Sequence, residues 1–213
     1  MKFDVKSWLF GLFLTFCLYS PAVAAISPIQ HFRPSNGAYI ATIPQGWTIH
    51  TDYSFNGLGP GHPLPGVLFS IPQSETAGTN LSPLGTGVAV VSLPAHQPCR
   101  ARDYLASARV PIELNEAGAL WSVAHSTDVG TGTKSTTQIF ARHLGGTCVL
   151  VLYLVHTRAL AISPPGSVHR YDRFALLGAF DQIRHSLVAT SSANINPRVR
   201  KALAATHTPV HEH

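Results

Sequence analysis

Two consecutive hydrophobic segments dominate the second half of the chain. Residues 135–142 are rich in β-branched side chains, and residues 147–156 are almost entirely apolar. Gly145 and Gly146 separate the two segments, and short apolar runs around a glycine pair predict a β-hairpin. Because the second segment is apolar at nearly every position, we expect it to be covered on both faces, in the middle of a sheet.

A helix is predicted after this hairpin, beyond a loop marked by Pro164, Pro165 and Gly166. From Asp172 onward the apolar residues recur at the three- to four-residue spacing of an amphipathic helix, which predicts that this helix covers one face of the sheet. The apolar positions are Phe174, Leu177, Phe180 or Ile183, and Leu187. The positions expected to face solvent are Arg173, Gln182, Arg184 and His185.

The remaining pattern is one of short strands and turns. Alternating or continuously apolar runs predict five further strands, at residues 38–43, 47–51, 67–71, 87–93 and 120–125. Residues 98–108 are predicted to form a second helix, and residues 128–134 a glycine- and threonine-rich loop. This order predicts an α+β fold, a mainly antiparallel sheet with two helices packed on it.

The amino-terminal residues are typical of an export signal. Lys2 and Lys6 precede a short apolar run, and an Ala-x-Ala site ends at Ala24. The run is shorter than the about 20 residues of a comfortable membrane span, so cleavage is favoured over a retained anchor and no stable span is expected afterwards. We therefore expect a signal peptide (residues 1–24), one domain (25–188) and a disordered, flexible tail (189–213) in a periplasmic or secreted protein.

Charge and cysteine content narrow the possible partners. The formal net charge is +5, and loss of two lysines and one aspartate with the signal peptide lowers it to +4. These charges are scattered, without the basic block typical of nucleic-acid binding, so we expect no nucleic-acid partner. The mature chain keeps Cys99 and Cys148. In an oxidising compartment an isolated pair favours a disulfide over a metal pair or a catalytic thiol.

Candidate chemistry is sparse. No Gly-x-Ser-x-Gly nucleophile elbow is present. His207, His211 and His213 in the tail could bind zinc, copper or nickel, although a solvated tail without a specific site is the simpler interpretation. Within the domain, His156, Tyr171, Asp172 and Arg173 could line a pocket, with a structural polar cluster, in which Asp172 caps the helix, as the alternative.

Two segments resemble known protein groups. The turn at residues 43–47, Ile-Pro-Gln-Gly-Trp, resembles the strand-turn-strand entry of the PsbP/Mog1-like fold. Residues 78–82, 99, 148–157, 165–166 and 171–177 together resemble an uncharacterised family of exported proteobacterial proteins. That second resemblance implies a periplasmic or surface-associated protein with a disulfide and no established activity, so no catalytic residues can be assigned from it.

Three functions follow from these observations. The first is an exported, non-enzymatic binding or accessory protein whose ligand or protein partner is unknown. The second is a periplasmic metal-handling protein that uses the histidine tail. The third is a hydrolase whose serine and histidine residues assemble only in the folded chain.

Overall fold

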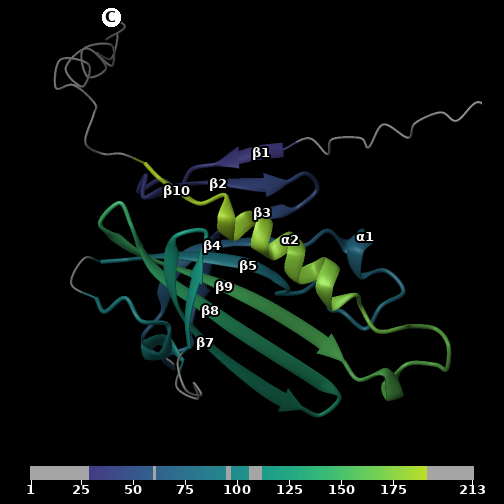
Figure 1. The fold of residues 1–213 in the computed structure, drawn as a ribbon. Coiled ribbons are helices and arrows are strands. Elements are labelled where there is room, and N and C mark those ends of the chain that lie inside the picture. Colours follow the sequence, from purple (N-terminus) through teal and green to yellow (C-terminus); the bar gives the residue numbers. More distant parts are fainter. Residues whose placement is uncertain (1–28, 60, 95–96, 106–111, 191–213) are drawn as a thin grey trace, which may run out of the picture.

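A seven-stranded antiparallel sheet forms the body of the molecule (Figure 1). The computed structural model describes residues 29–59, 61–94, 97–105 and 112–190. Across the sheet the strands are β3 (Thr48–Phe55), β4 (Leu64–Ser70), β5 (Gly87–Leu93), β9 (Thr147–Arg158), β8 (Thr133–Leu144), β7 (Ala119–Gly130) and β6 (Ile112–Glu116). The apolar strand β9 is central, as predicted.

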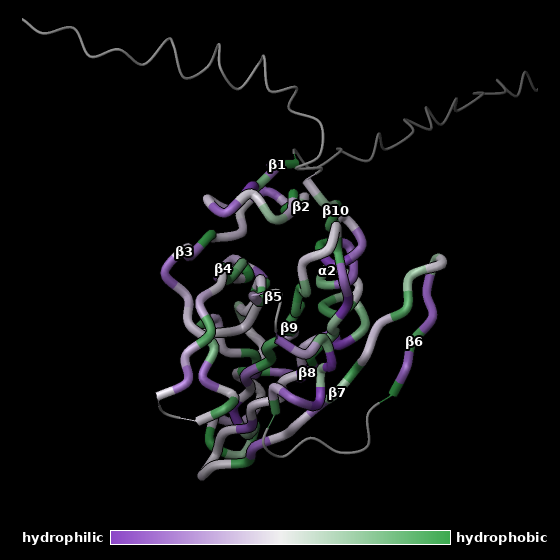
Figure 2. Tube along the Cα trace, turned by 90° about the vertical axis from the view of Figure 1, so that its left-hand side faces the viewer, coloured by the Kyte–Doolittle hydropathy of each residue, from purple (hydrophilic) through white to green (hydrophobic). Residues whose placement is uncertain are grey.

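A small second sheet lies on the other side of the long helix α2 (Arg173–His185). It contains β1 (Ile29–Phe32), β2 (Tyr39–Pro44) and the short β10 (Val188–Ala189). Figures 1 and 2 both show this sheet at the top of the molecule, and Figure 2 shows β6 at the outer edge of the large sheet. The short helix α1 (Gln73–Thr76) and the 3-10 turns η1 (Ala101–Tyr104) and η2 (Leu160–Ile162) complete the described fold.

The large sheet is buried on both faces at its centre. One core joins the sheet to α2 and β2, and includes Trp47, Trp121 and Phe180. The second core lies under η1 on the opposite face, and includes Tyr104, Leu150 and Leu152. Every residue from Cys148 to Val155 is buried. Coverage of both faces explains why β9 can be apolar at consecutive positions.

The helix α2 begins where predicted but presents a different face. Asp172 caps it, since its carboxylate oxygen accepts hydrogen bonds from the N–H groups of Phe174 (2.9 Å) and Ala175 (3.0 Å). The predicted orientation was wrong at two positions. Phe174 is 89% exposed because Leu176, not Phe174, begins the buried stripe, whereas Arg184 is only 2% exposed.

Two segment predictions also needed correction. The helix expected at residues 98–108 is reduced, within its described part, to the 3-10 turn η1, because the chain there packs Ala101 and Tyr104 onto the sheet. The loop expected at residues 128–134 is a tight hairpin, since β7 and β8 remain paired up to Gly130 and Thr133. The strands β1 and β6 were not predicted, and β10 extends one residue into the predicted tail.

A disulfide links Cys99 to Cys148, as predicted, with 5.5 Å between the Cα atoms. Cys148 is the second residue of β9, and Cys99 lies just before η1. The bond therefore fastens the segment that covers the second core to the central strand.

Replacing both cysteines by alanine should lower the free energy of unfolding. The bond closes a loop with a sequence separation of 49 residues, which corresponds to about 4 kcal/mol on the chain-entropy model. Urea denaturation of the oxidised protein and of Cys99→Ala/Cys148→Ala measures the difference. A reducing agent should lower the stability of the wild type alone, and equal stability of both proteins would contradict the prediction.

Candidate functional site

The helix α2 covers only part of the sheet face on which it packs. Val123, Phe140 and Val151 are paired across β7, β8 and β9 and form one row of this face. The side chains of this row are apolar and belong to the core. Beyond that row the face becomes polar, and Figure 1 shows β7 and β8 continuing away from α2. The next three rows are His125–Gln138–Tyr153, Thr127–Thr136–Val155 and Val129–Lys134–Thr157.

These rows form the floor of a cleft with a volume of about 840 Å³. Arg173 and Leu177, one turn apart on α2, form one wall. Asn80, Arg170 and Tyr171 form the end wall. Two other cavities in the described part of the chain are smaller, at about 400 and 610 Å³. The position of the large cleft follows from the point at which the helix leaves the sheet.

Asn80 fastens the end wall to the sheet. Its backbone N–H donates to the carbonyl of His169 (2.9 Å), and its carbonyl accepts from the N–H of Arg158 (2.9 Å). Its side-chain NH₂ donates to the carbonyl of Arg158 (3.1 Å), and its side-chain oxygen accepts from the N–H of Tyr171 (3.2 Å). One residue thus joins the end of β9 to the segment before α2, so that Arg170 and Tyr171 are held beside the cleft.

The cleft is cationic. Lys134, Arg158, Arg170 and Arg173 line it, and the lining contains no aspartate or glutamate. Within the described part of the chain, the side chains of these four residues form no ion pair or hydrogen bond. An arrangement of uncompensated cations in a concave site is suited to binding an anion.

The four predicted pocket residues do not lie together. Tyr171 and Arg173 line the cleft, whereas Asp172 caps the helix. Tyr153 and Val155 face the cleft. Because successive side chains of a strand point to opposite faces, His156 lies on the other face of β9, where it contacts Ser135.

Lys134, Thr136 and Gln138 were missed as site residues. Their alternation along one strand was the available signal. Lys134 was placed in the loop expected at residues 128–134, whereas Thr136 and Gln138 lay in the strand predicted at residues 135–142 but were not assigned to a site.

His156 forms a separate polar contact. Its Nδ1 lies 2.8 Å from the hydroxyl oxygen of Ser135, and burial lowers the pKa of the imidazole, which favours the neutral ring. In the described structure no carboxylate hydrogen-bonds to this ring, so the pair lacks the third group of a catalytic triad. The ring also packs against Gly85, where an added Cβ would lie 3.2 Å from Nε2.

The predicted metal ligands His207, His211 and His213 lie outside the described residues. Within the described residues, no three histidine, cysteine, aspartate or glutamate side chains are grouped so that they could hold a metal ion.

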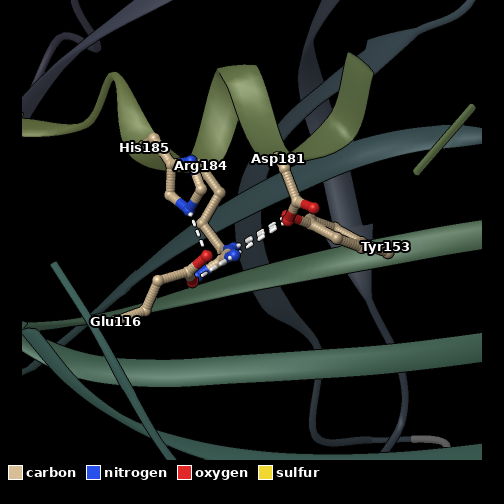
Figure 3. Close-up of polar contacts among 5 residues, drawn as sticks. All are labelled: Glu116, Tyr153, Asp181, Arg184 and His185. Atoms are coloured by element: carbon tan, nitrogen blue, oxygen red, sulfur yellow. Dashed lines mark hydrogen bonds and ion pairs between the residues drawn. The ribbon is translucent and has the colours of Figure 1, made fainter. Parts of the chain in front are cut away.

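A buried arginine holds α2 beside the cleft (Figure 3). Arg184 donates through Nη2 to Glu116 on β6 (2.7 Å) and to Asp181 (2.8 Å), and through Nε to the hydroxyl of Tyr153 (2.8 Å). Its guanidinium carbon lies 4.4 Å from the ring centre of Phe140. These contacts join the helix to three strands.

Tyr153 connects this cluster to the cleft. Its hydroxyl donates to Asp181 (2.6 Å), while its side chain belongs to the cleft floor. Burial and the hydrogen bond to Asp181 raise the pKa of the Tyr153 hydroxyl, which therefore remains a donor at neutral pH. The cluster fixes the height of α2 above the sheet, and so the width of the cleft.

Comparisons with known proteins identify no family. No family model and no curated protein match the sequence. Among solved structures, the chain is similar to the cyanobacterial PsbP protein CyanoP from Synechocystis sp. PCC 6803, with 16% sequence identity and a TM-score of 0.40. The similarity covers 81% of this chain and 99% of CyanoP. None of the helices in the described structure has the length and apolar character needed to cross a membrane.

Removing the Tyr153 hydroxyl should destabilise the protein. Tyr153→Phe leaves Asp181 and Arg184 each without one hydrogen bond, and we expect a loss of about 1–2 kcal/mol in urea denaturation. Tyr39→Phe is the matched control, because the Tyr39 hydroxyl is buried and has no partner in the described structure. That variant should be as stable as the wild type or more stable. Equal losses in both variants would contradict the assigned role.

The ion pairs of Glu116 should contribute to stability in a pH-dependent manner. Hydrogen bonds from Arg184 and His185 lower the pKa of Glu116 below 4.5. Its contribution is therefore complete above pH 4.5 and is lost as the pH falls through the lowered value. Glu116→Gln should be less stable than the wild type at pH 6, and the difference should shrink as the pH is lowered from 4.5 through the lowered pKa of Glu116. A difference that stays constant across this range would show that charge is not involved.

Proposed function

We propose that the protein is an exported, non-enzymatic binding module whose ligand occupies the cleft between α2 and strands β7–β9. The observation that carries the proposal is the face of the sheet that α2 leaves uncovered. It is concave, it changes from apolar to polar along the same strands, and its side chains at Thr127, Thr136 and Gln138 form no hydrogen bond within the described residues. A volume of about 840 Å³ lies within the roughly 300–1,000 Å³ of small-molecule sites.

Export is part of the same proposal. The amino-terminal sequence has the order of a signal peptide, and the Cys99–Cys148 bond is of the kind that persists in oxidising compartments. Both observations support a periplasmic or secreted location, in which the cleft would meet extracytoplasmic ligands.

We also propose a PsbP/Mog1-like fold and membership of the uncharacterised family of exported proteobacterial proteins. The tight turn at residues 44–47, which joins β2 to β3, supports the first assignment. The second is supported by the disulfide and by the sequence at residues 171–177, which contains the cap and first turn of α2. The metal-handling alternative depends on the three tail histidines.

Native mass spectrometry of the untagged, mature protein recovered from a periplasmic extract tests the binding function. The wild type should carry a small-molecule mass increment. Thr136→Trp, which fills the centre of the cleft floor, should lose that increment. Thr51→Trp is the matched control, because Thr51 is an exposed threonine on the edge strand β3 and should tolerate the same change.

Three results would contradict the proposal. A bound mass that persists in Thr136→Trp would place the ligand outside the cleft. A metal-sized increment that disappears only when residues 207–213 are deleted would favour the metal-handling function. Turnover of generic ester substrates, abolished by Ser135→Ala, would favour the hydrolase.

A further inference from the structure

We infer that the cleft recognises a small anion with at least two negative charges, carried by carboxylate or phosphate groups. This inference rests on the proposed binding function and specifies its ligand class. It assigns charge recognition to Lys134, Arg170 and Arg173, and recognition of the ligand's oxygen atoms to Thr127, Thr136 and Gln138.

The three cations approach the cleft from three different elements. Lys134 lies on the cleft face of β8, since it alternates with Ser135 and is paired with Thr157, another cleft residue. Arg173 lies in the first turn of α2, and Arg170 lies in the end wall that Asn80 fastens. Cations that converge from a floor and two walls surround one volume, unlike a row of charges along a single exposed helix.

These cations have no carboxylate partner within the described residues. Arg184, elsewhere on α2, pairs with two carboxylates. Arg173 and Arg170 pair with none in the described structure. Asp172, which lies between them in sequence, is occupied as the helix cap and accepts two backbone hydrogen bonds. Within the described residues, the cleft therefore offers exposed cations without a carboxylate partner to a bound anion.

Neutral donors lie among the cations on the cleft floor. Thr127 and Thr136 are directly paired across β7 and β8, and Gln138 lies in the adjacent row. None of these three side chains forms a hydrogen bond in the described part of the structure. Hydroxyl and amide groups can donate to the oxygens of a carboxylate or phosphate, while arginine can bind the same groups with two parallel hydrogen bonds.

The carboxy-terminal segment of the chain is not a suitable occupant. Residues 191–213 contain Arg198, Arg200 and Lys201 but only one acidic residue, Glu212. This segment has the same sign of charge as the cleft, and like charges oppose its binding there. A separate anionic molecule is the complementary ligand.

Isothermal titration calorimetry of the mature protein with citrate and with pyrophosphate tests the inference, with a neutral trisaccharide as the uncharged probe. At least one anion should bind, and binding should weaken as salt is raised, because the contacts are ionic. Tighter citrate binding would assign carboxylates, and tighter pyrophosphate binding would assign phosphates. Backbone amide NMR signals of Thr136, Gln138 and Tyr171 should shift on titration.

Variants locate the binding. Arg173→Gln should weaken anion binding by roughly tenfold or more, because one charge-assisted contact is lost. Arg173→Lys, which keeps the charge, should retain most of the affinity. Arg33→Gln is the control, since Arg33 is an exposed arginine just after β1. Both positions are on the surface, so circular dichroism should show unchanged folding for all three variants.

The remaining outcomes separate this inference from the proposed function. Equal anion binding by Arg173→Gln and Arg33→Gln would overturn the inference, because the attraction would then be one of net charge alone. Binding of the trisaccharide in the cleft, without binding of either anion, would overturn the inference while leaving the binding function intact. The absence of any bound mass in the native protein, together with the absence of binding by all three probes, would overturn both.

Discussion

The position of α2 depends on one buried guanidinium. Arg184 is almost fully enclosed, and its contacts reach β6 through Glu116, β9 through Tyr153 and β8 through Phe140. A buried charge without such partners would cost several kcal/mol, so the helix is held where all of these contacts can form together. The apolar stripe that includes Leu176 and Phe180 packs the helix against the sheet. Arg184 determines the position of the helix along the sheet.

The cleft follows directly from that position. The strands β7, β8 and β9 each have 12 residues and extend past the part of the sheet that α2 covers. Under the helix the shared face is apolar, and beyond it the same face carries threonine, glutamine and lysine. The core and the candidate site are therefore two halves of one surface, divided at the row that contains Tyr153.

Local sequence signals predicted most of the strands and the helix α2, but not how that helix is oriented. The β8–β9 hairpin, the Asp172 cap and the cysteine pairing could all be predicted, because each depends on neighbouring residues or on cysteine parity. The burial of Arg184 could not, since its partner Glu116 comes from a strand 68 residues away. Similarly, alternation along β9 places His156 and Tyr153 on opposite faces of the sheet. Only the folded chain shows which of these two side chains points toward α2.

The pairing of β7 with β8 has one further consequence for how this architecture could vary. Two additional residues in each strand of the hairpin would add one more row to the exposed face. Because side chains alternate with a period of two, every existing side chain would stay on its present face of the sheet. A slip of β8 by a single residue would instead place Ser135 and Thr137 on the cleft face in place of Lys134 and Thr136. Lengthening by twos at the Gly130–Thr133 turn is thus a route by which the same scaffold could accommodate longer ligands, with its hydrophobic interior unaltered.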